Sequence, residues 1–248
     1  MTSRLDQVVA AGALDGPGPH WGCFSTLSDP MATEALGRLG FDFILIDLQH
    51  GAGRLDDLVP LLLAVEAGGA VPLVRLRSDE PSDIGYALDL GAWAVVVPMV
   101  ESADQTERVV AAARYAPQGN RSFGPIRPSE PPESGRVMVM LETARGLARV
   151  DEIAAVDGLL GILAGPSDLA LSLGLPLDYP VGAGPHQGAL ERISAACARA
   201  GIVAAIQTAG AAEAKLRAAQ GFHWISMRSD RLIMQTEARR MLAEVEGP

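Results

Sequence analysis

Four charged side chains lie at or just beyond the ends of short apolar runs in this sequence. His50 and Arg75 stand at the exits of the second and third runs, Glu142 follows the fifth, and Asp168 follows the sixth across a turn that contains Gly165. The carboxyl ends of parallel strands form one face of an α/β protein, so we expect these side chains to meet there. Taken singly, each carboxylate could instead be a helix cap or a first-turn acid.

Glu142 and Asp168 are candidate metal ligands, because two carboxylates without a His or Cys cluster suit a hard cation. Mg²⁺ takes one or two protein carboxylates and fills its remaining positions with water or substrate oxygens, and Mn²⁺ is served by similar ligands. A 2-keto acid, with adjacent carboxylate and keto oxygens, could chelate such an ion. The planar guanidinium of Arg75 could bind the carboxylate of that substrate or polarise its keto oxygen.

His50 is the candidate general base, because an imidazole titrates near neutral pH. Asp89 ends a predicted helix, where an acid opposes the helix dipole, and pairing with an imidazole in the same chain or in a neighbouring one would explain that position. A surface acid in solvent is the alternative. Lys215 is the only lysine and lies in a helical pattern, which argues against Schiff-base chemistry on a desolvated amine.

Short apolar runs alternate with longer amphipathic stretches from Trp21 onward. The runs are Trp21–Ser25, Phe43–Asp47, Val71–Arg75, Ala94–Pro98, Val137–Leu141, Gly158–Leu163, Ile202–Ala205 and Trp224–Met227. The helical patterns are Pro30–Leu39, Leu55–Ala67, Ser82–Leu90, Ala103–Tyr115, Ala144–Val156, His186–Ala200, Ala211–Ala219 and Asp230–Val245. Such a series of strand–helix units predicts an α/β protein with a (β/α)8 TIM barrel.

A doubly wound sheet is the alternative architecture, and it would carry a phosphate-binding glycine motif after its first strand. Gly16, Gly18 and Gly22 precede that strand and have the wrong last interval, so the barrel is favoured. We predict a single domain over residues 1–248. Within it, residues 1–20 form a leading helix and an entry segment at the bottom of the barrel, and residues 119–136 form a loop near the active-site mouth.

The composition and net charge of the chain argue against some kinds of partner and some cellular locations. The formal net charge of −10 argues against nucleic acid, whose phosphates would be repelled. No apolar run reaches the roughly 20 residues that span a bilayer, and the acidic start is unlike a signal peptide, so we expect no membrane contact and a cytoplasmic location. Cys23 and Cys197 are too few for a disulfide framework and are expected to be buried thiols.

From Trp21 to Leu242 the chain resembles the HpcH/HpaI class II pyruvate aldolases, which act in the breakdown of aromatic acids and deoxysugar acids. The matching stretches are GFDFILIDLQHG, PLVRLRSDEPSDIGYALDLGAWAVVVPMVESADQ, RYAPQGNRSFG, LETARGLARVDEIAAVDGLLGILAGPSDLALSLG and FHWISMRSDRLIMQ. The resemblance implies a barrel whose last helix is exchanged between subunits of a homohexamer, a trimer of dimers. It also implies a divalent cation, Mg²⁺ or Mn²⁺ with Co²⁺ as a further candidate.

The resemblance assigns roles to particular residues. It implies that Glu142 and Asp168 hold the metal, that Arg75 contacts the pyruvate oxygens, and that His50 is the base, paired with Asp89. The backbone of the turn would hold the pyruvate carboxylate through Gly165, Pro166 and Ser167.

The chain departs from the family pattern at several places around this site. Phe24, a predicted substrate-binding position, replaces a usual Trp, Gln49 replaces a Glu, and Met140 replaces a Gln. The loop after Gly124 is shorter than in the well-known members. The residues that would bind the metal and pyruvate are therefore retained, whereas the residues that would shape the aldehyde side of the pocket are not.

The predicted reaction is cleavage of a 4-hydroxy-2-keto acid to pyruvate and an aldehyde, or the reverse condensation. One alternative is a citrate-lyase-like carbon–carbon lyase that uses a CoA thioester, for which arginines such as Arg121 and Arg127 could bind the nucleotide. Another is decarboxylation of oxaloacetate through the same enolate chemistry. A barrel retained only for binding or assembly is the non-enzymatic alternative.

Overall fold

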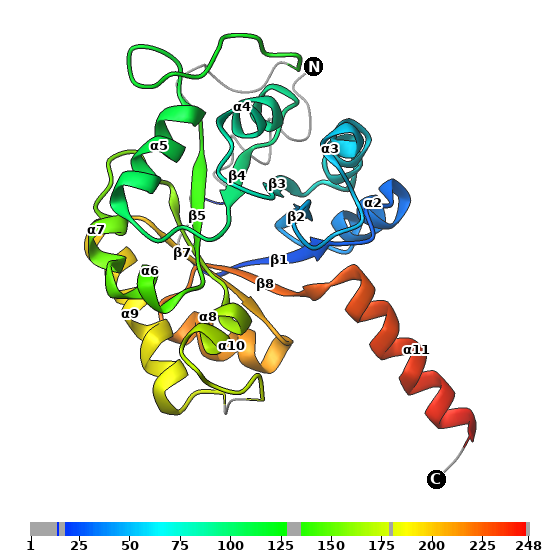
Figure 1. Ribbon diagram of the computed structural model, residues 1–248. Helices are drawn as coiled ribbons and strands as arrows, with labels where there is room; N and C mark the ends of the chain where they lie inside the picture. Colours follow the sequence, from blue (N-terminus) through cyan, green and yellow to red (C-terminus); the bar gives the residue numbers. More distant parts are fainter. Residues whose placement is uncertain (1–13, 15–17, 128–134, 179–180, 247–248) are drawn as a thin grey trace.

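The computed structural model describes residue 14 and residues 18–127, 135–178 and 181–246. Within these residues, eight parallel strands close into a barrel in chain order, which confirms the predicted TIM-barrel class (Figure 1). The strands are β1 (His20–Ser25), β2 (Phe43–Asp47), β3 (Val71–Arg75), β4 (Ala94–Val97), β5 (Val137–Leu141), β6 (Gly161–Ala164), β7 (Val203–Thr208) and β8 (Trp224–Ser229).

Helices follow the strands, and all of the described helices except the last form the outer layer of the barrel. They are α2 (Pro30–Arg38), α3 (Leu58–Gly68) preceded by the 3₁₀ turn η1 (Leu55–Asp57), α4 (Pro81–Asp89), α5 (Ala103–Ala113), α6 (Ala144–Ala148), α7 (Val150–Ala154), α8 (Pro166–Ser172), α9 (Gly184–Ala200), α10 (Ala211–Ala219) and α11 (Asp230–Glu246). The predicted helix Ala144–Val156 is broken into α6 and α7 at Arg149. The structure also adds α8, which begins with Pro166 at its first position, where the missing proline N–H has no helical partner to lose.

The strands are apolar throughout because they are covered on both faces. In β2, Ile44 and Ile46 pack outward against the helices, whereas Phe43 and Leu45 point into the barrel. The ring of Trp224 joins the inner cluster and lies 6.0 Å from the ring of Phe43, measured between centroids. This alternation fills the barrel interior with side chains and leaves the polar groups at the strand exits.

Local signals in the sequence set where the helices begin and end. Asp29 accepts a hydrogen bond from the N–H of Ala32 and caps α2 (2.8 Å), and Ser102 caps α5 through the N–H of Gln105 (3.2 Å). Gly40 and Gly91 follow α2 and α4 with φ of 97° and 102°, a left-handed conformation that favours glycine. Each helix therefore returns the chain to the amino end of the next strand.

The described part of the connection from α5 to β5 lies at the amino ends of the strands, whereas we expected residues 119–136 near the active-site mouth. Its backbone N–H groups at Ile126 and Arg127 donate to the carbonyl of Asp89, the last residue of α4 (3.0 and 3.1 Å), and Arg127 pairs with Glu66 near the end of α3 (2.7 Å). The reason is topological: a loop that follows a helix and precedes a strand belongs to the end opposite the strand exits. Residues 128–134 lie outside the described part of the chain.

The predicted cover at the bottom of the barrel is described at one position. Leu14 is buried in the inner cluster, which also contains Trp93 and Trp224. The predicted leading helix itself falls on residues outside the described ones.

Helix α11 leaves the barrel after β8 and extends away from it (Figure 1). Its first residue, Asp230, is fixed to the β1–α2 connection, because its carboxylate accepts hydrogen bonds from the N–H groups of Thr26 (2.9 Å) and Leu27 (3.0 Å). Beyond this anchor its large apolar side chains are exposed: Leu232, Ile233, Met234, Met241, Leu242 and Val245. Among the described residues, no helix is both long and apolar enough to cross a membrane.

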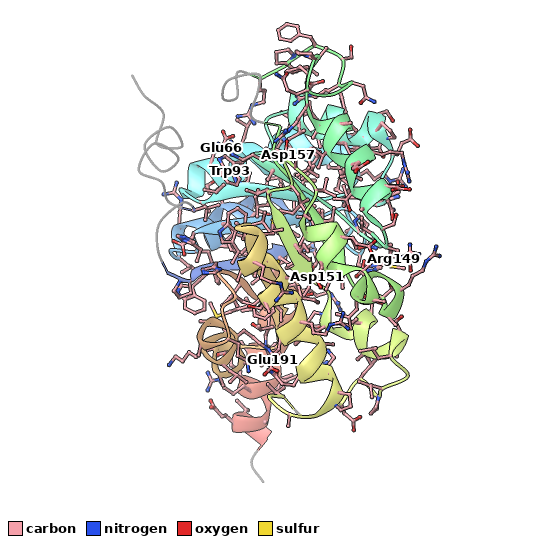
Figure 2. The ribbon with its side chains drawn as sticks, turned by 90° about the vertical axis from the view of Figure 1, so that its left-hand side faces the viewer. Glu66, Trp93, Arg149, Asp151, Asp157 and Glu191 are labelled. Atoms are coloured by element: carbon pink, nitrogen blue, oxygen red, sulfur yellow. The ribbon has the colours of Figure 1, made fainter. Side chains whose placement is uncertain are left out.

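The opposite side of the barrel is a shell of packed helices (Figure 2). There Asp151 of α7 pairs with Arg199 of α9 at 2.5 Å, and both side chains remain more than half exposed. Surface ion pairs of this kind contribute little to stability.

Candidate active site

The carboxyl ends of four strands bring the predicted polar groups to one face of the barrel. Asp47 and Arg75 are paired residues at the ends of β2 and β3. Leu141 and Ala164 are paired at the ends of β5 and β6, so Glu142 and the turn after Ala164 continue from neighbouring positions. Closure of the sheet therefore places Arg75, Glu142 and the Asp168 turn around the same mouth, as predicted.

Arg75 is held by a buried, two-pronged ion pair with Asp47. Its Nε and Nη2 atoms donate to the two carboxylate oxygens at 2.9 and 2.6 Å, and the side chains are 6% and 1% exposed. Oδ1 of Asp47 also accepts from the backbone N–H groups of Gln49 (3.0 Å) and His50 (3.2 Å). Asp47 thus fixes both the guanidinium and the turn that carries His50.

The sequence alone assigns no role to Asp47. The signal was available in principle, because an acid and an arginine end two consecutive predicted strands, and in a parallel sheet such ends lie side by side. Their register, Asp47 opposite Arg75, became visible only in the folded barrel.

The remaining face of Arg75 contacts two positions at which the chain departs from the family pattern. Nη1 lies 3.5 Å from the sulfur of Met140, and the guanidinium carbon lies 5.1 Å from the centre of the Phe24 ring. A thioether is a weak acceptor, so this N–H retains its capacity for a stronger oxygen acceptor. Phe24 is almost fully buried and supports the guanidinium from the barrel interior.

Glu142 is buried, and its carboxylate is oriented by the backbone. Oε1 accepts a hydrogen bond from the N–H of Met99 at 2.8 Å. Met99 has a φ of 57°, which is uncommon for a residue other than glycine and is the kind of backbone strain found at functional sites. A Cβ at Gly165 would lie 2.7 Å from Oε2 of Glu142, so the turn after β6 needs a glycine to approach this carboxylate.

The pKa of Glu142 depends on burial and on three neighbouring groups. Burial raises its pKa above the usual value, the Met99 N–H lowers the pKa, the charge of Asp168 raises it, and the charge of Arg75 lowers it. Asp168 is solvent-exposed on α8, at the rim above the buried Glu142. Asp168 is close enough to disfavour the charge of Glu142, and a hard cation bound to both carboxylates would relieve that cost.

This donor set fits a divalent cation that keeps several non-protein ligands. In the described part of the chain, no group of three or more His, Cys, Asp or Glu side chains could hold a metal ion. Two carboxylates would leave the other positions to water and substrate oxygens, which is the pattern typical of Mg²⁺ sites.

His50 and Asp89 are not brought together within one chain. His50 is exposed beyond the end of β2, at the carboxyl end of the barrel. Asp89 ends α4, which runs antiparallel to the strands, so it lies at the opposite end. There Asp89 accepts from Nη2 of Arg121 (2.5 Å) and from the hydroxyl of Tyr115 (3.5 Å). The structure does not pair His50 with Asp89 of the same chain, so a pairing with Asp89 of a neighbouring chain stays a prediction.

A closed barrel with two acidic groups and a buried Arg–Asp pair at the carboxyl ends of its strands is the architecture of a TIM-barrel enzyme. The model of the HpcH/HpaI aldolase/citrate lyase family matches residues 20–232, and the chain belongs to this family. The resemblance that the sequence motifs indicated is thereby confirmed.

Relatives and a solved structure agree with this assignment. The hydroxypyruvate/pyruvate aldolase of Rhizorhabdus wittichii is 38% identical over 236 residues, which cover 89% of this chain and 92% of the relative. The 5-keto-4-deoxy-D-glucarate aldolase of Shigella dysenteriae is 31% identical, with 89% and 90% covered. The structure of an HpcH/HpaI aldolase/citrate lyase family protein from Burkholderia cenocepacia has a TM-score of 0.85 at 27% identity and covers both chains fully. The predicted enzyme class, an aldolase of this family, is confirmed.

Replacing Asp47 by Asn should lower the free energy of unfolding by about 3 to 5 kcal/mol, because removing one partner of a buried ion pair leaves the other charge uncompensated. Urea denaturation of the metal-free protein measures this change. The control is Asp151→Asn, at a residue labelled in Figure 2, which breaks the exposed pair with Arg199 and should change stability by less than about 1 kcal/mol. Equal effects of the two substitutions would contradict a structural role for the Asp47–Arg75 pair.

The metal-free wild type should lose stability relative to Glu142→Gln as the pH rises. The folded-state pKa of Glu142 is raised above 4.5, so the folded state binds more protons than the unfolded state between these two pKa values. The free energy of unfolding therefore falls across that interval, and the amide variant lacks this loss. Calorimetric melting of both proteins in chelator, from about pH 4.5 to pH 8, measures the difference. A pH-independent difference would contradict the shifted pKa.

Proposed function

We propose that this protein is a divalent-metal-dependent class II pyruvate aldolase that cleaves or forms 4-hydroxy-2-keto acids. The observation that carries the proposal is the meeting of Glu142, Asp168 and the buried Arg75 at one end of the barrel. The names of the two relatives support the same chemistry. A cytoplasmic location stays a prediction.

Glu142 and Asp168 would hold the cation, Mg²⁺ or Mn²⁺ with Co²⁺ as a further candidate. When bound, a divalent cation supplies a Lewis acid that stabilises negative charge on a keto oxygen. Arg75 would share that charge, since Asp47 already holds its fork in place and Nη1 faces only the weak acceptor of Met140. Because the guanidinium is already oriented before substrate binds, no free energy is needed to orient it during the reaction.

The turn after β6 would bind the pyruvate carboxylate through Ser167. The N–H of Gly165 donates to the carbonyl of Leu141 (3.1 Å), and Pro166 has no N–H. Of the three turn residues that we predicted, Ser167 is thus the one that offers a backbone donor at the exposed rim.

His50 would remove the proton of the 4-hydroxyl group during cleavage and return it during synthesis. Its exposed position at the rim suits contact with the part of the substrate that leaves as the aldehyde. Asp89 of a neighbouring copy would orient the imidazole, and Phe24 would act on the substrate through its support of Arg75.

The arginines considered for a CoA thioester are engaged elsewhere. Arg121 pairs with Asp89 and Arg127 pairs with Glu66, both at the amino ends of the strands. A nucleotide bound there would be separated from Glu142 by the length of the barrel. This arrangement favours the aldolase over the citrate-lyase-like alternative, and the oxaloacetate decarboxylase is retained as a competing outcome of the activity assay.

Exchange of the pyruvate methyl protons in deuterated water tests the proposal. Wild-type protein with Mn²⁺ or Mg²⁺ should catalyse this exchange, and excess chelator, Glu142→Gln or Asp168→Asn should abolish it, because the enolate then lacks its charge stabilisation. His50→Asn should still bind Mn²⁺ but should lose about 10²- to 10⁴-fold in aldol cleavage. Proton NMR follows both reactions.

The matched control for this assay is Asp157→Asn, an exposed acid in the turn between α7 and β6, which should exchange like the wild type (Figure 2). Exchange that is equally fast with metal and with chelator would overturn the metal-dependent mechanism. Release of CO₂ from oxaloacetate without any condensation of pyruvate with a panel of aldehydes would favour the decarboxylase.

We also propose that α11 packs on a second copy of the chain, within a homohexamer arranged as a trimer of dimers. In one copy its apolar side chains are exposed. An apolar groove lies on the barrel between α10 and α2, lined by Trp21, Leu39, Phe41, Ala214 and Met227. Helix α11 of the partner would fill this groove and bury its own apolar side chains there. The groove lies where the eighth helix of a closed barrel packs.

Light scattering after size-exclusion chromatography should give the wild type the mass of six 25.9 kDa chains. Substituting both Met241 and Leu242 by Glu should yield smaller species, because charges would enter the apolar contact. Arg149→Glu adds negative charge on the exposed shell and should leave the hexamer intact. A monomeric wild type would overturn this assembly.

A further inference from the structure

We propose that His186 is a positioning residue that orients the Ser167 peptide at the mouth of the barrel. Its effect on substrate binding rests on the proposed aldolase function, whereas its effect on the turn does not. His186 belongs to α9 and is 2% exposed, and its Nε2 lies 2.9 Å from the carbonyl oxygen of Pro166. Because a carbonyl only accepts hydrogen bonds, Nε2 carries the proton and donates.

The acceptor of this bond belongs to the same peptide group as the proposed substrate donor. The carbonyl of Pro166 and the N–H of Ser167 are the two ends of one planar, trans peptide unit and point in opposite directions. A hydrogen bond that draws the carbonyl inward to His186 therefore turns the Ser167 N–H outward to the rim. It also polarises the amide, which strengthens the N–H as a donor.

The buried surroundings of the His186 imidazole favour its neutral form. Burial lowers the pKa of His186, and the charge of Arg217 lowers it further, against the opposing effects of the Pro166 carbonyl and Glu213. A neutral imidazole has a single N–H donor, and here that donor is directed at Pro166.

A frame of side chains between α9 and α10 surrounds His186. Arg217 of α10 is fully buried, and its Nη1 donates to Oε1 of the adjacent Gln187 at 2.5 Å. Its Nε and Nη2 donate to Glu213 at 3.2 and 2.9 Å. Gln187 in turn donates to Glu191, which is labelled on α9 in Figure 2 (2.8 Å). These bonds fix the start of α9, from which His186 reaches the turn.

This connection matters because it reaches the first turn of a short helix. Helix α8 is only seven residues long, and Ser167 and Asp168 in its first turn are exposed. Isolated helices of this length are marginal in water, so their orientation depends on contacts made elsewhere. The bond from His186 supplies such a contact one residue before Ser167 and two before Asp168.

Two substitutions separate the hydrogen bond from the packing. His186→Gln keeps an amide N–H donor near the position of Nε2, and His186→Leu keeps an apolar side chain of similar bulk without a donor. Hydrogen–deuterium exchange of the metal-free protein should show faster exchange over residues 161–172 in His186→Leu and near-wild-type exchange in His186→Gln. With Mn²⁺, the KM of His186→Leu for the keto acid should rise about tenfold with a smaller change in kcat, as expected for one lost hydrogen bond.

The control is Ser194→Ala, which removes another hydrogen bond of α9, the partly buried one to the carbonyl of Gln220 (2.8 Å), without touching α8. It should leave both readouts at wild-type values. If His186→Leu does not fold, as judged by circular dichroism, His186→Asn replaces it, because its shorter amide does not reach Pro166.

The outcomes distinguish the effect of His186 on the turn from its effect on substrate binding. Wild-type exchange in the variant without a donor, or equal damage from His186→Gln, would overturn the role of the hydrogen bond. Faster exchange with an unchanged KM would overturn the link to the substrate. Failure of the wild type to bind Mn²⁺ would instead overturn the proposed function, and the exchange experiment on the metal-free protein would still decide whether His186 holds the turn.

Discussion

The buried ion pair between Asp47 and Arg75 is the interaction on which the rest of the mouth depends. A guanidinium placed inside a barrel is stable only with a charge partner, and Asp47 supplies both carboxylate oxygens. The same carboxylate holds the turn that leads to His50. Arg75 then acts on Glu142, whose pKa it lowers. One acid at the end of β2 therefore organises the basic, the acidic and the candidate proton-transfer parts of the site.

The charge of Arg75 is compensated by Asp47, whereas burial and Asp168 disfavour the charge of Glu142. Burial and Asp168 both raise its pKa, while a strained backbone at Met99 holds the carboxylate in one orientation. A barrel with a large apolar interior can tolerate this local cost, and a cation would convert the cost into binding energy. Two of the four departures from the family motifs, Phe24 and Met140, contact the guanidinium of Arg75.

Much of the fold and half of the site could be predicted residue by residue. Caps such as Asp29 and the apolar runs of β2 and β3 are local patterns, and they located the strand exits at Arg75 and Glu142. The role of Asp47, the contact of His186 with Pro166 and the position of the loop before β5 were missed or wrong. Each of these depends on a partner from a distant part of the chain or on the direction of a helix.

The sequence by itself determined the strand–helix alternation, the closed barrel that follows from it, and the face on which the charged side chains emerge, because periodicity and capping act over a few neighbouring residues. Only the tertiary structure decided which charges meet. Asp47 pairs with Arg75 across 28 positions, and Asp89 pairs with Arg121 at the far end of the barrel from His50. Electrostatic partners are chosen by distance in space, and that distance exists only after the sheet has closed.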